Sequence, residues 1–529
     1  MQTENESIMA NKQIFAAPTQ TSHRAQATDT VNRAGGRAYA LSAKAALAQM
    51  AVTGVFNDTY HATAKMQLDD VRDLITKVEP AFLAKLAVYA RQRAYMKDLP
   101  AYLCAVLAER DVALLARVFE RVVDNGKMLR NFVQMVRSGQ AGRRSLGTRP
   151  KKLVQQWLQN ASDERLLSAS VGTAPSLADV MRLAHPKAEG AQRDAMFKYL
   201  LGRDVDRDAL PANVQALEAF RRGESLQVPK VSFELLTALP LSAADWTAIA
   251  RHATWTQTRM NLNTFLRHGV FESREMVELV ATRLRDVKLI EQAKVFPYQL
   301  LAAYLHVSED MPSRVVNALQ DAMEAAIENV PKFGCDVAVL PDVSRSMHDP
   351  VTGRREGATS KMRCIDVAGL FASAVLRRNP DALVVPFDTR VHAHRLNARD
   401  AVVTNAKTLA GFGGGGTACA IALAHLNEQK HMAELVIYVS DNESWADEVR
   451  RGKKATATLE EWTKYKARVK NAKLVCIDIT PNATTQARDR HDILNVGGFS
   501  DEVFNVIDLF SRGELGGEHW VREIEKIEI

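Results

Sequence analysis

The sequence predicts a multidomain protein with an all-helical region over residues 31–333 and a doubly wound α/β domain over residues 334–529. Before residue 334, apolar residues recur at spacings of three and four, as they do on one face of a helix. After it, short apolar runs rich in β-branched residues alternate with helical patterns, which is typical of parallel strands buried between helices. The chain of 529 residues is also too long for a single hydrophobic core.

The first 30 residues are rich in Thr, Gln, Asn and Ser and contain no long apolar segment. A secretory signal peptide needs such a segment, so we expect residues 1–30 to form a flexible tail instead. No uninterrupted apolar stretch of the sequence reaches the length of a membrane-spanning helix.

Helical spacing continues through residues 31–333, with short polar joints between the segments. The clearest segments are Leu41–Val52, Pro80–Arg93, Ala101–Leu107, Val112–Val123, Leu153–Leu158, Phe233–Leu239 and Ser313–Ile327. An all-helical region of this length is either a large bundle or an α-solenoid of stacked helix pairs. No strict repeat can be read from the sequence, so degenerate repeats of the HEAT type are the natural candidate.

From Gly334 onward, strands and helices alternate. The predicted strands are Cys335–Leu340, Leu383–Phe387, Leu435–Val439, Leu474–Ile479 and Ile493–Val496. The predicted helices are Met362–Arg377, Cys419–Leu426, Leu459–Val469 and Asp501–Phe510. Because the strands show no alternation of polar and apolar residues, we expect both faces of the sheet to be covered by helices.

Three predicted loops of the α/β domain carry oxygen-bearing side chains. Asp342, Ser344 and Ser346 follow the first predicted strand at a spacing of two, and Asp441 follows the third. Thr417 comes after a glycine-rich run and just before a predicted helix. Loops at the carboxyl edge of an open α/β sheet lie close together, so these side chains are expected to converge.

The residue types at this edge suit a hard cation, most of all Mg²⁺, which prefers oxygen ligands and keeps several waters. The hydroxyls of Ser344, Ser346 and Thr417 would bind the ion, while Asp342 and Asp441 would hold its coordinated waters. An open position would remain for a carboxylate or phosphate of a partner. Alternatively, the two serines and Asp441 only cap turns and a helix. Together the three loops look like the metal-ion-dependent adhesion site (MIDAS) of a von Willebrand factor A domain.

A second candidate site is a basic stretch in the helical region. Between Asn125 and Ser162 there are eight Lys or Arg residues and no Asp or Glu, and a further basic cluster spans residues 182–187. Residues 137–152 look like a loop, in which cations without neighbouring carboxylates stay available for phosphates. The alternative is an ordinary solvated face. The candidate RNA-binding cations are Arg137, Arg143, Arg144, Arg149, Lys151, Lys152, Arg182 and Lys187.

The net charge and the cysteines indicate the kind of partner and the cellular compartment. The formal charge of +7 divides into +8 for residues 1–333 and −1 for residues 334–529, which favours a polyanionic partner for the helical region, although scatter of this size is ordinary. The five cysteines are scattered and form no C-x-x-C pair. A disulfide framework or zinc site is therefore not expected, and a cytoplasmic location fits best.

Several motifs together resemble the Ro ribonucleoprotein (TROVE) family, and bacterial members most closely. They are Gly35-Gly36-Arg37-Ala38-Tyr39, Asp58-Thr59-Tyr60, residues 147–157, residues 182–187 and Phe296-Pro297-Tyr298. The resemblance implies that the helical repeats form a ring closed by the A domain. It also implies that small noncoding Y RNA binds the basic outer surface, where His185 would lie with Arg182, Lys187, Lys151 and Lys152. Single-stranded 3′ ends of misfolded or structured RNAs would enter the central hole.

The favoured function is a non-catalytic, RNA-binding ring in noncoding RNA metabolism and RNA quality control. Bacterial members imply cooperation with a 3′ exoribonuclease that is tethered through Y RNA. The alternative is a metal-dependent protein–protein adhesion scaffold without RNA, for which an acid-free basic stretch has no use. A metal-dependent nuclease or phosphatase is disfavoured, because one hydroxyl-rich site lacks the paired, carboxylate-bridged metals usual for phosphoryl hydrolysis.

Overall fold

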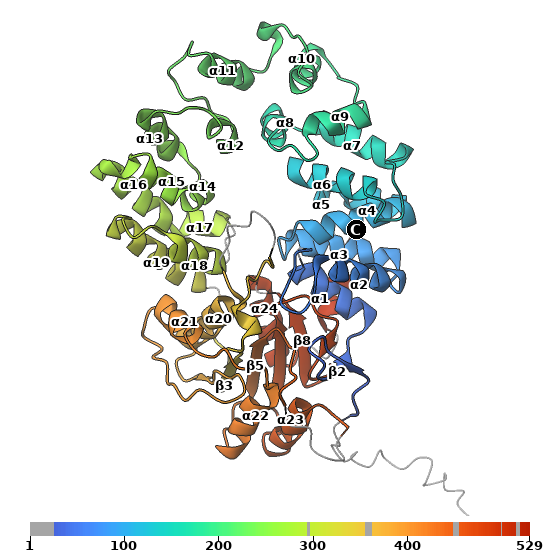
Figure 1. Cartoon of the computed structure of the whole chain (residues 1–529), viewed down its shortest axis with the longest axis vertical. Helices are drawn as coiled ribbons and strands as arrows, with labels where there is room; N and C mark the ends of the chain where they lie inside the picture. Colours follow the sequence, from blue (N-terminus) through green and yellow to red (C-terminus); the bar gives the residue numbers. More distant parts are fainter. Residues whose placement is uncertain are drawn as a thin grey trace, which may run out of the picture.

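The computed structural model describes residues 26–54, 56–293, 297–328, 330–354, 362–447, 454–498, 500–514 and 519–529. Its helices follow one another along an arc whose two ends both rest on an α/β domain (Figure 1). The predicted combination of a ring of helical repeats with a doubly wound α/β domain is confirmed.

The arc has two arms. Its first arm contains α1 (Ala43–Thr53), α2 (Ala64–Thr76), α3 (Pro80–Gln92), α4 (Asp98–Arg110), α5 (Val112–Val122), α6 (Gly126–Arg137), α7 (Thr148–Asn160), α8 (Asp163–Ala169), α9 (Leu177–Ala184) and α10 (Ala191–Leu200). Its second arm contains α11 (Ala212–Arg221), α12 (Phe233–Leu236), α13 (Ala243–His252), α14 (Trp255–Met260), α15 (Leu262–Arg267), α16 (Arg274–Arg285), α17 (Val287–Ala293), α18 (Pro297–His306) and α19 (Ser313–Ile327). In the described part of the chain, no helix combines the length and the apolar character needed to cross a membrane.

Buried tryptophans join successive helices of the arc. The indole of Trp157 in α7 donates to the carbonyl of Val123, after α5, at 2.8 Å. In the second arm, the indole of Trp255 in α14 donates to the carbonyl of Leu284 in α16 at 3.0 Å. Each side chain thus buries an apolar ring while its one polar group finds a partner. Trp157 and Trp255 both lie in the core of the helical region.

The α/β domain contains a five-stranded parallel sheet, in the order β4-β3-β5-β6-β8. The strands are β3 (Val337–Pro341), β4 (Leu383–Val384), β5 (Leu435–Ser440), β6 (Lys473–Asp478) and β8 (Ile493–Gly497). The helices are α20 (Cys364–Arg378), α21 (Val402–Ala410), α22 (Cys419–Glu428), α23 (Ala457–Arg468), α24 (Asp501–Ser511) and α25 (His519–Glu525).

Alternate residues of the sheet belong to two separate cores. Val339 and Ile437 pack with α20 and α24 in a core that is continuous with the helical arc. Leu340 and Val436 face the other way, into a smaller core with α22 and α23. The helices therefore cover both faces of the sheet, as its uninterrupted apolar strands predict.

The arc begins with a β-hairpin rather than a helix, which the sequence pattern does not predict. The hairpin consists of β1 (Thr30–Val31) and β2 (Arg37–Ala40), and β2 pairs with β7 (Thr484–Thr485) of the α/β domain. Tyr39 is fully buried there. A four-residue strand whose partner lies far away in the sequence leaves almost no local pattern, so periodicity does not reveal it.

The C-terminal helix α25 fastens the same arm to the α/β domain. The indole of Trp520 in α25 donates to the hydroxyl of Tyr89 in α3 at 3.1 Å, and both groups are buried. The ammonium of Lys44 in α1 lies 2.6 Å from a carboxylate oxygen of both Glu79 and Glu525. The first arm is thus held from two sides, by β2 and by α25.

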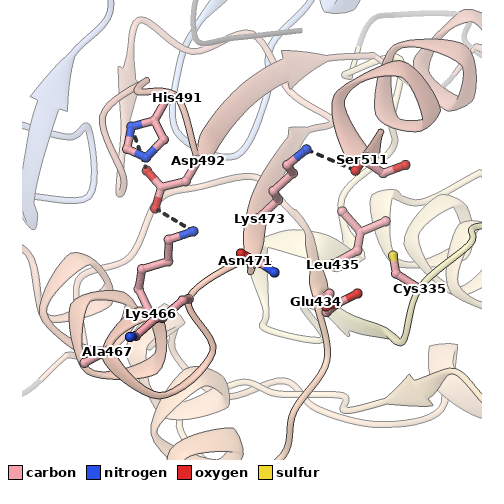
Figure 2. A pocket seen from close by; sticks show the side chains of 11 residues that line it. Cys335, Glu434, Leu435, Lys466, Ala467, Asn471, Lys473, His491, Asp492 and Ser511 are labelled. Atoms are coloured by element: carbon pink, nitrogen blue, oxygen red, sulfur yellow. Dashed lines mark hydrogen bonds and ion pairs between the residues drawn. The ribbon is translucent and has the colours of Figure 1, made fainter. Parts of the chain in front are cut away.

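A cavity of about 1040 Å³ opens at the amino edge of the sheet (Figure 2). Two of its lysines are already used inside the protein. Lys473 donates to the carbonyls of Phe510 and Ser511 at the end of α24, at 2.7 and 3.0 Å, and Lys466 donates to the carbonyl of Ala472 at 2.6 Å. The predicted cation ligands lie at the opposite, carboxyl edge.

Candidate functional site

The first metal-site loop leaves β3 in a tight turn. The backbone amide of Ser344 donates to Asp342 Oδ1 at 2.8 Å, and the hydroxyls of Ser344 and Ser346 lie 3.3 Å apart. All three side chains are buried. The spacing of two therefore brings one carboxylate and two hydroxyls to one point, as the sequence predicts.

The loop after β5 joins this cluster through Ser440, which no sequence motif indicated. The hydroxyl of Ser440 donates to Asp342 Oδ2 at 2.6 Å, which ties the ends of the two adjacent strands together. Asp441, the next residue, is 2 % exposed. The predicted convergence of Asp342 and Asp441 is present in the structure.

The glycine-rich run places Thr417 between the other two loops. The amide of Arg345 donates to the carbonyl of Gly415 at 2.9 Å, and a β-carbon on Gly413 would lie only 1.7 Å from the carbonyl oxygen of Val343. On its other side, the carbonyl of Thr417 accepts from the amide of Trp445 at 3.1 Å. Glycine is thus required where the two loops touch.

The electrostatics of this cluster favour a cation. Burial, and after it the negative charge of Asp441, raises the pKa of the Asp342 carboxyl well above its usual range. Two buried carboxyl groups close together disfavour each other's ionisation unless a proton or a cation compensates. The surrounding donors are hydroxyl and carboxylate oxygens, which suits a hard ion such as Mg²⁺. The residues present therefore fit the predicted ion.

The metal-site character rests on hydroxyls rather than on a dense group of acidic, histidine or cysteine ligands. Among the described residues, no set of three or more His, Cys, Asp or Glu side chains is arranged to hold a metal ion.

His61 lies beside the metal-site loops, although it comes from the helical region. Its Nε2 atom is 3.7 Å from Asp441 Oδ2. Burial alone would lower the pKa of His61, but the neighbouring Asp441 and Glu443 raise it above its ordinary value. Because 380 positions separate His61 from Asp441, nothing in the local sequence pointed to this contact.

The basic residues of α7 and α9 meet at one corner of the first arm. His185 ends α9 in a left-handed conformation with φ of 52°, and its Nδ1 lies 3.3 Å from the ammonium of Lys151. The amide of Gln155 in α7 donates to the carbonyls of Ala184 and His185 at 2.7 and 3.2 Å, which fixes the corner. Lys152 and Lys187 are exposed nearby in sequence. We call Lys151, Lys152, His185 and Lys187 the basic corner.

The loop that the sequence predicts over residues 137–152 is shorter in the structure. It ends at Gly147, which has φ of 70°, and α7 begins at Thr148. Arg149, Lys151 and Lys152 are therefore helical. Pro150 does not prevent this, because a proline is tolerated in the first turn of a helix, where amides have no intrahelical acceptor.

The remaining candidate cations differ in whether their charge is exposed or already bonded within the protein. Arg137, Arg144 and Arg149 are exposed, and Arg182 is exposed but pairs with Asp179 at 3.1 Å. For Arg143 the expectation of an available charge is wrong. Its guanidinium donates to the carbonyls of Ala108 and Ser145 and lies 3.8 Å from Glu109. The stretch contains no acidic residue of its own, but Glu109 of the neighbouring helix α4 lies close to Arg143 in the folded protein.

Further cations lie in or near the lining of a cavity between the two arms. A cavity of about 1000 Å³ is bordered by the starts of α6 and α8 on one side and by α12, α13 and α14 on the other. Arg165 is among its lining residues, and Lys127 follows directly on the lining residue Gly126. Burial, and after it the charges of Lys127 and Arg91, lowers the pKa of nearby Lys97. Lys127 belongs to the basic stretch of the sequence, but no sequence pattern indicates Lys97 or Arg165.

A ring of helical repeats, closed by an α/β domain with hydroxyl-rich loops at its carboxyl edge, is the architecture that these observations define. Residues 336–511 match the family described as the Ro60 vWA domain. The predicted resemblance to the Ro ribonucleoprotein family is confirmed, and it extends beyond this domain.

Two comparisons cover nearly the whole chain. It is 26% identical, over 92% of its own length and 95% of the relative, to the RNA-binding protein RO60 of Deinococcus radiodurans. Its fold matches the crystal structure of the Deinococcus radiodurans RO (RSR) protein with a TM-score of 0.61. That match covers 90% of this chain and 100% of the other, at 22% sequence identity.

Proposed function

We propose that this protein is a non-catalytic RNA-binding ring. Small noncoding Y RNA binds its basic outer surface, and single-stranded 3′ ends of structured or misfolded RNAs enter the space between the arms. The similarity to a protein named for RNA binding supports the general class. The basic corner and the cations near the cavity between the arms lie in different places, which supports separate sites for folded and single-stranded RNA.

The basic corner is the observation that carries the proposal. Lys151 and His185 lie 3.3 Å apart with Lys152 and Lys187 exposed beside them in sequence, and these four form no ion pair with a carboxylate of the described residues. Cations that are not neutralised internally release counterions when they meet phosphates, which is the main source of affinity for nucleic acid. An adhesion scaffold for protein has no need of such a surface.

The inner cations suit a single strand better than a duplex. Arg165 lines a cavity bounded by both arms, and Lys127 directly follows its lining residue Gly126. Lys97 lies near enough to Lys127 for that charge to lower its pKa. A ligand would reach these cations by entering between the arms. A folded RNA would stay on the outside, and its 3′ tail would thread inward. This arrangement fits a role in RNA quality control, with a 3′ exoribonuclease tethered through Y RNA.

At the carboxyl edge of the sheet, Ser344, Ser346 and Thr417 would hold Mg²⁺, with Asp342 and Asp441 positioning its waters. Bound there, the ion would supply an electrophilic centre for an acidic protein ligand. These residues offer one hydroxyl-rich position rather than a carboxylate-bridged pair, so we assign the site to binding and not to hydrolysis.

A cytoplasmic location fits the cysteines. All five are free, and Cys104, Cys364, Cys419 and Cys476 are buried. Free buried thiols without disulfides are usual where the compartment is reducing.

Two RNA probes test the proposed surfaces separately. We would measure fluorescence anisotropy with a folded stem-loop RNA and with a single-stranded 3′-tailed oligonucleotide. Lys151→Gln/Lys152→Gln should weaken the stem-loop and spare the single strand, while Lys97→Gln/Lys127→Gln should do the opposite. Lys464→Gln/Lys470→Gln, on the α/β domain, is the matched control for the removal of two charges.

Unchanged binding of both RNAs in both variants would contradict the proposal. If the wild-type protein bound neither RNA but captured acidic protein ligands in a Mg²⁺-dependent way, the adhesion scaffold would replace it.

A further inference from the structure

The β1–β2 hairpin of the helical region contacts the loop after β5, which carries Asp441 and which we call the second metal-site loop. The buried amide of Asn32 donates to the carbonyl of Ser444 at 2.8 Å. The backbone amide of Ala34 donates to Glu443 Oε2 at 3.0 Å, and Glu443 is 1 % exposed. These two acceptors follow Asp441 by two and three residues. The loop that carries a proposed cation ligand is therefore held from the other region of the chain.

Gly36 shows how close this approach is. A β-carbon on Gly36 would lie 1.9 Å from the carbonyl oxygen of Ser444, although the backbone of Gly36 does not need a positive φ. The glycine is thus required by contact and not by conformation. Immediately after it, β2 continues the attachment through its pairing with β7.

A second segment of the helical region grips the first metal-site loop. Between α1 and α2, the side-chain amide of Asn57 donates to the carbonyl of Thr352 at 2.7 Å. Next to it, Asp58 and Arg354 form an antiparallel backbone bridge. Thr352 and Arg354 lie on the continuation of the loop that begins with Asp342, Ser344 and Ser346.

His61 closely follows Asn57 in the sequence and lies beside Asp441. Its side chain is 17 % exposed, and its Nε2 is buried without a hydrogen-bond partner among the described residues. The nearest acidic atom is Asp441 Oδ2, at 3.7 Å. A buried polar atom without a partner is costly, so this position favours a function in which Nε2 gains one.

We call the contacts of residues 32–36 and 57–63 with the metal-site loops the seam. We infer that cation binding at the carboxyl edge and attachment of the ring's first arm are one linked equilibrium, in which His61 positions Asp441 from the helical side of the seam. The inference rests on the metal part of the proposed function. A cation needs the three ligand-bearing loops in a fixed arrangement. Asn32, Asn57 and His61 hold two of those loops, so each event favours the other by the same factor.

Calorimetric titration of the full chain with MgCl₂ tests the linkage from the side of the metal. Asn32→Ala and Asn57→Ala touch none of the proposed ligands, yet each should lower Mg²⁺ affinity by about fivefold or more, the lower range of such couplings. Asn427→Ala is the control, since Asn427 bonds Glu461 within the α/β domain. His61→Ala should also weaken Mg²⁺ binding, and His61→Gln, which keeps a donor, should restore most of it.

Hydrogen exchange of the wild-type protein tests the linkage from the side of the seam and needs no variant. Amides of residues 32–36 and 57–63 should exchange more slowly in Mg²⁺ than in EDTA, while those of α13 should not change. Mg²⁺ binding with unaltered seam exchange, or equal Mg²⁺ affinity in all folded variants, would overturn the linkage alone. A wild-type protein that binds no Mg²⁺ would instead overturn the metal assignment and the linkage together.

Discussion

At the scale of single residues, His185 links local backbone geometry to the proposed function. It ends α9 in a left-handed conformation, which most residues avoid and which Asn tolerates well. The exposed imidazole lies next to the ammonium of Lys151. The position therefore allows the imidazole to be removed without disturbing the helix end.

His185→Asn should weaken stem-loop RNA binding several-fold and leave the single-stranded probe and the melting temperature nearly unchanged. The reason is that Asn keeps the left-handed helix end but removes a surface contact. Fluorescence anisotropy with both RNAs measures the change in affinity. The control is His491→Asn, at the amino edge of the sheet in the α/β domain. Equally weakened binding of both RNAs together with a lower melting temperature would show that His185 has a structural role instead.

Arg143 and Arg144 are neighbours in sequence with opposite expected roles. Arg143→Gln should lower the free energy of unfolding by about 1–3 kcal/mol, because the carbonyls of Ala108 and Ser145 lose a charged donor. Arg144→Gln should change stability little, since its side chain is exposed. Urea unfolding of the two variants makes the comparison. Equal stability of both would contradict the structural role of Arg143.

At the scale of elements, Asp492 joins β8 to α23 at the amino edge of the sheet (Figure 2). Its carboxylate accepts from the indole of Trp462 at 3.0 Å and forms a two-point ion pair with Arg490. Burial alone would raise the pKa of Asp492, but Arg490, Trp462 and Lys466 together lower it below its usual value.

Asp492→Asn should cost about 1–3 kcal/mol at neutral pH, because Trp462 and Arg490 lose a charged acceptor, while the partly exposed Arg490 can still be hydrated. A carboxyl whose pKa is lowered by folding stabilises the folded state above its unfolded pKa of about 3.9, and this contribution disappears as pH falls through the lower, folded value. The difference between wild type and variant in urea unfolding should therefore shrink below about pH 4. A constant difference down to about pH 2 would contradict this assignment.

Most of the helices and strands could be predicted from the sequence, but several contacts between them could not. Helices of the arc and the five strands of the parallel sheet were predictable, because their apolar spacing is local. The clustering of Asp342, Ser344 and Asp441 was predictable for a related reason, since parallel strands end at one edge. The β2–β7 pairing, the contact of His61 with Asp441 and the internal bonds of Arg143 were not, because each depends on a partner that is distant in sequence or brought close only by packing.

At the scale of the whole molecule, closure of the arc depends on short terminal segments. Trp520 of α25 is 4 % exposed and reaches Tyr89 of α3. The C-terminal residue adds a contact, because the guanidinium of Arg117 in α5 donates to the carbonyl of Ile529. The end of the chain thus returns to the beginning of the ring.

Trp520→Ala should lower stability by about 3–5 kcal/mol, since it removes a large buried side chain and leaves a cavity. The damage should concentrate in the first arm, where α1 and α3 should become accessible to protease before α16 and α19. Limited proteolysis followed by mass spectrometry measures the order of cleavage. Trp445→Ala is the control, because that indole is 55 % exposed. Simultaneous cleavage of both arms would contradict a local fastening.

The central claim is that the helical ring binds folded RNA through the basic corner, and the salt dependence of that binding tests it most directly. For stem-loop RNA, the logarithm of the binding constant should fall linearly with the logarithm of salt concentration. In Lys151→Gln/Lys152→Gln/Lys187→Gln the slope should become shallower by roughly 0.7–0.9 for each phosphate that the variant no longer binds. A triple variant that keeps the affinity and the slope of the wild-type protein, while its melting temperature is unchanged, would contradict the claim.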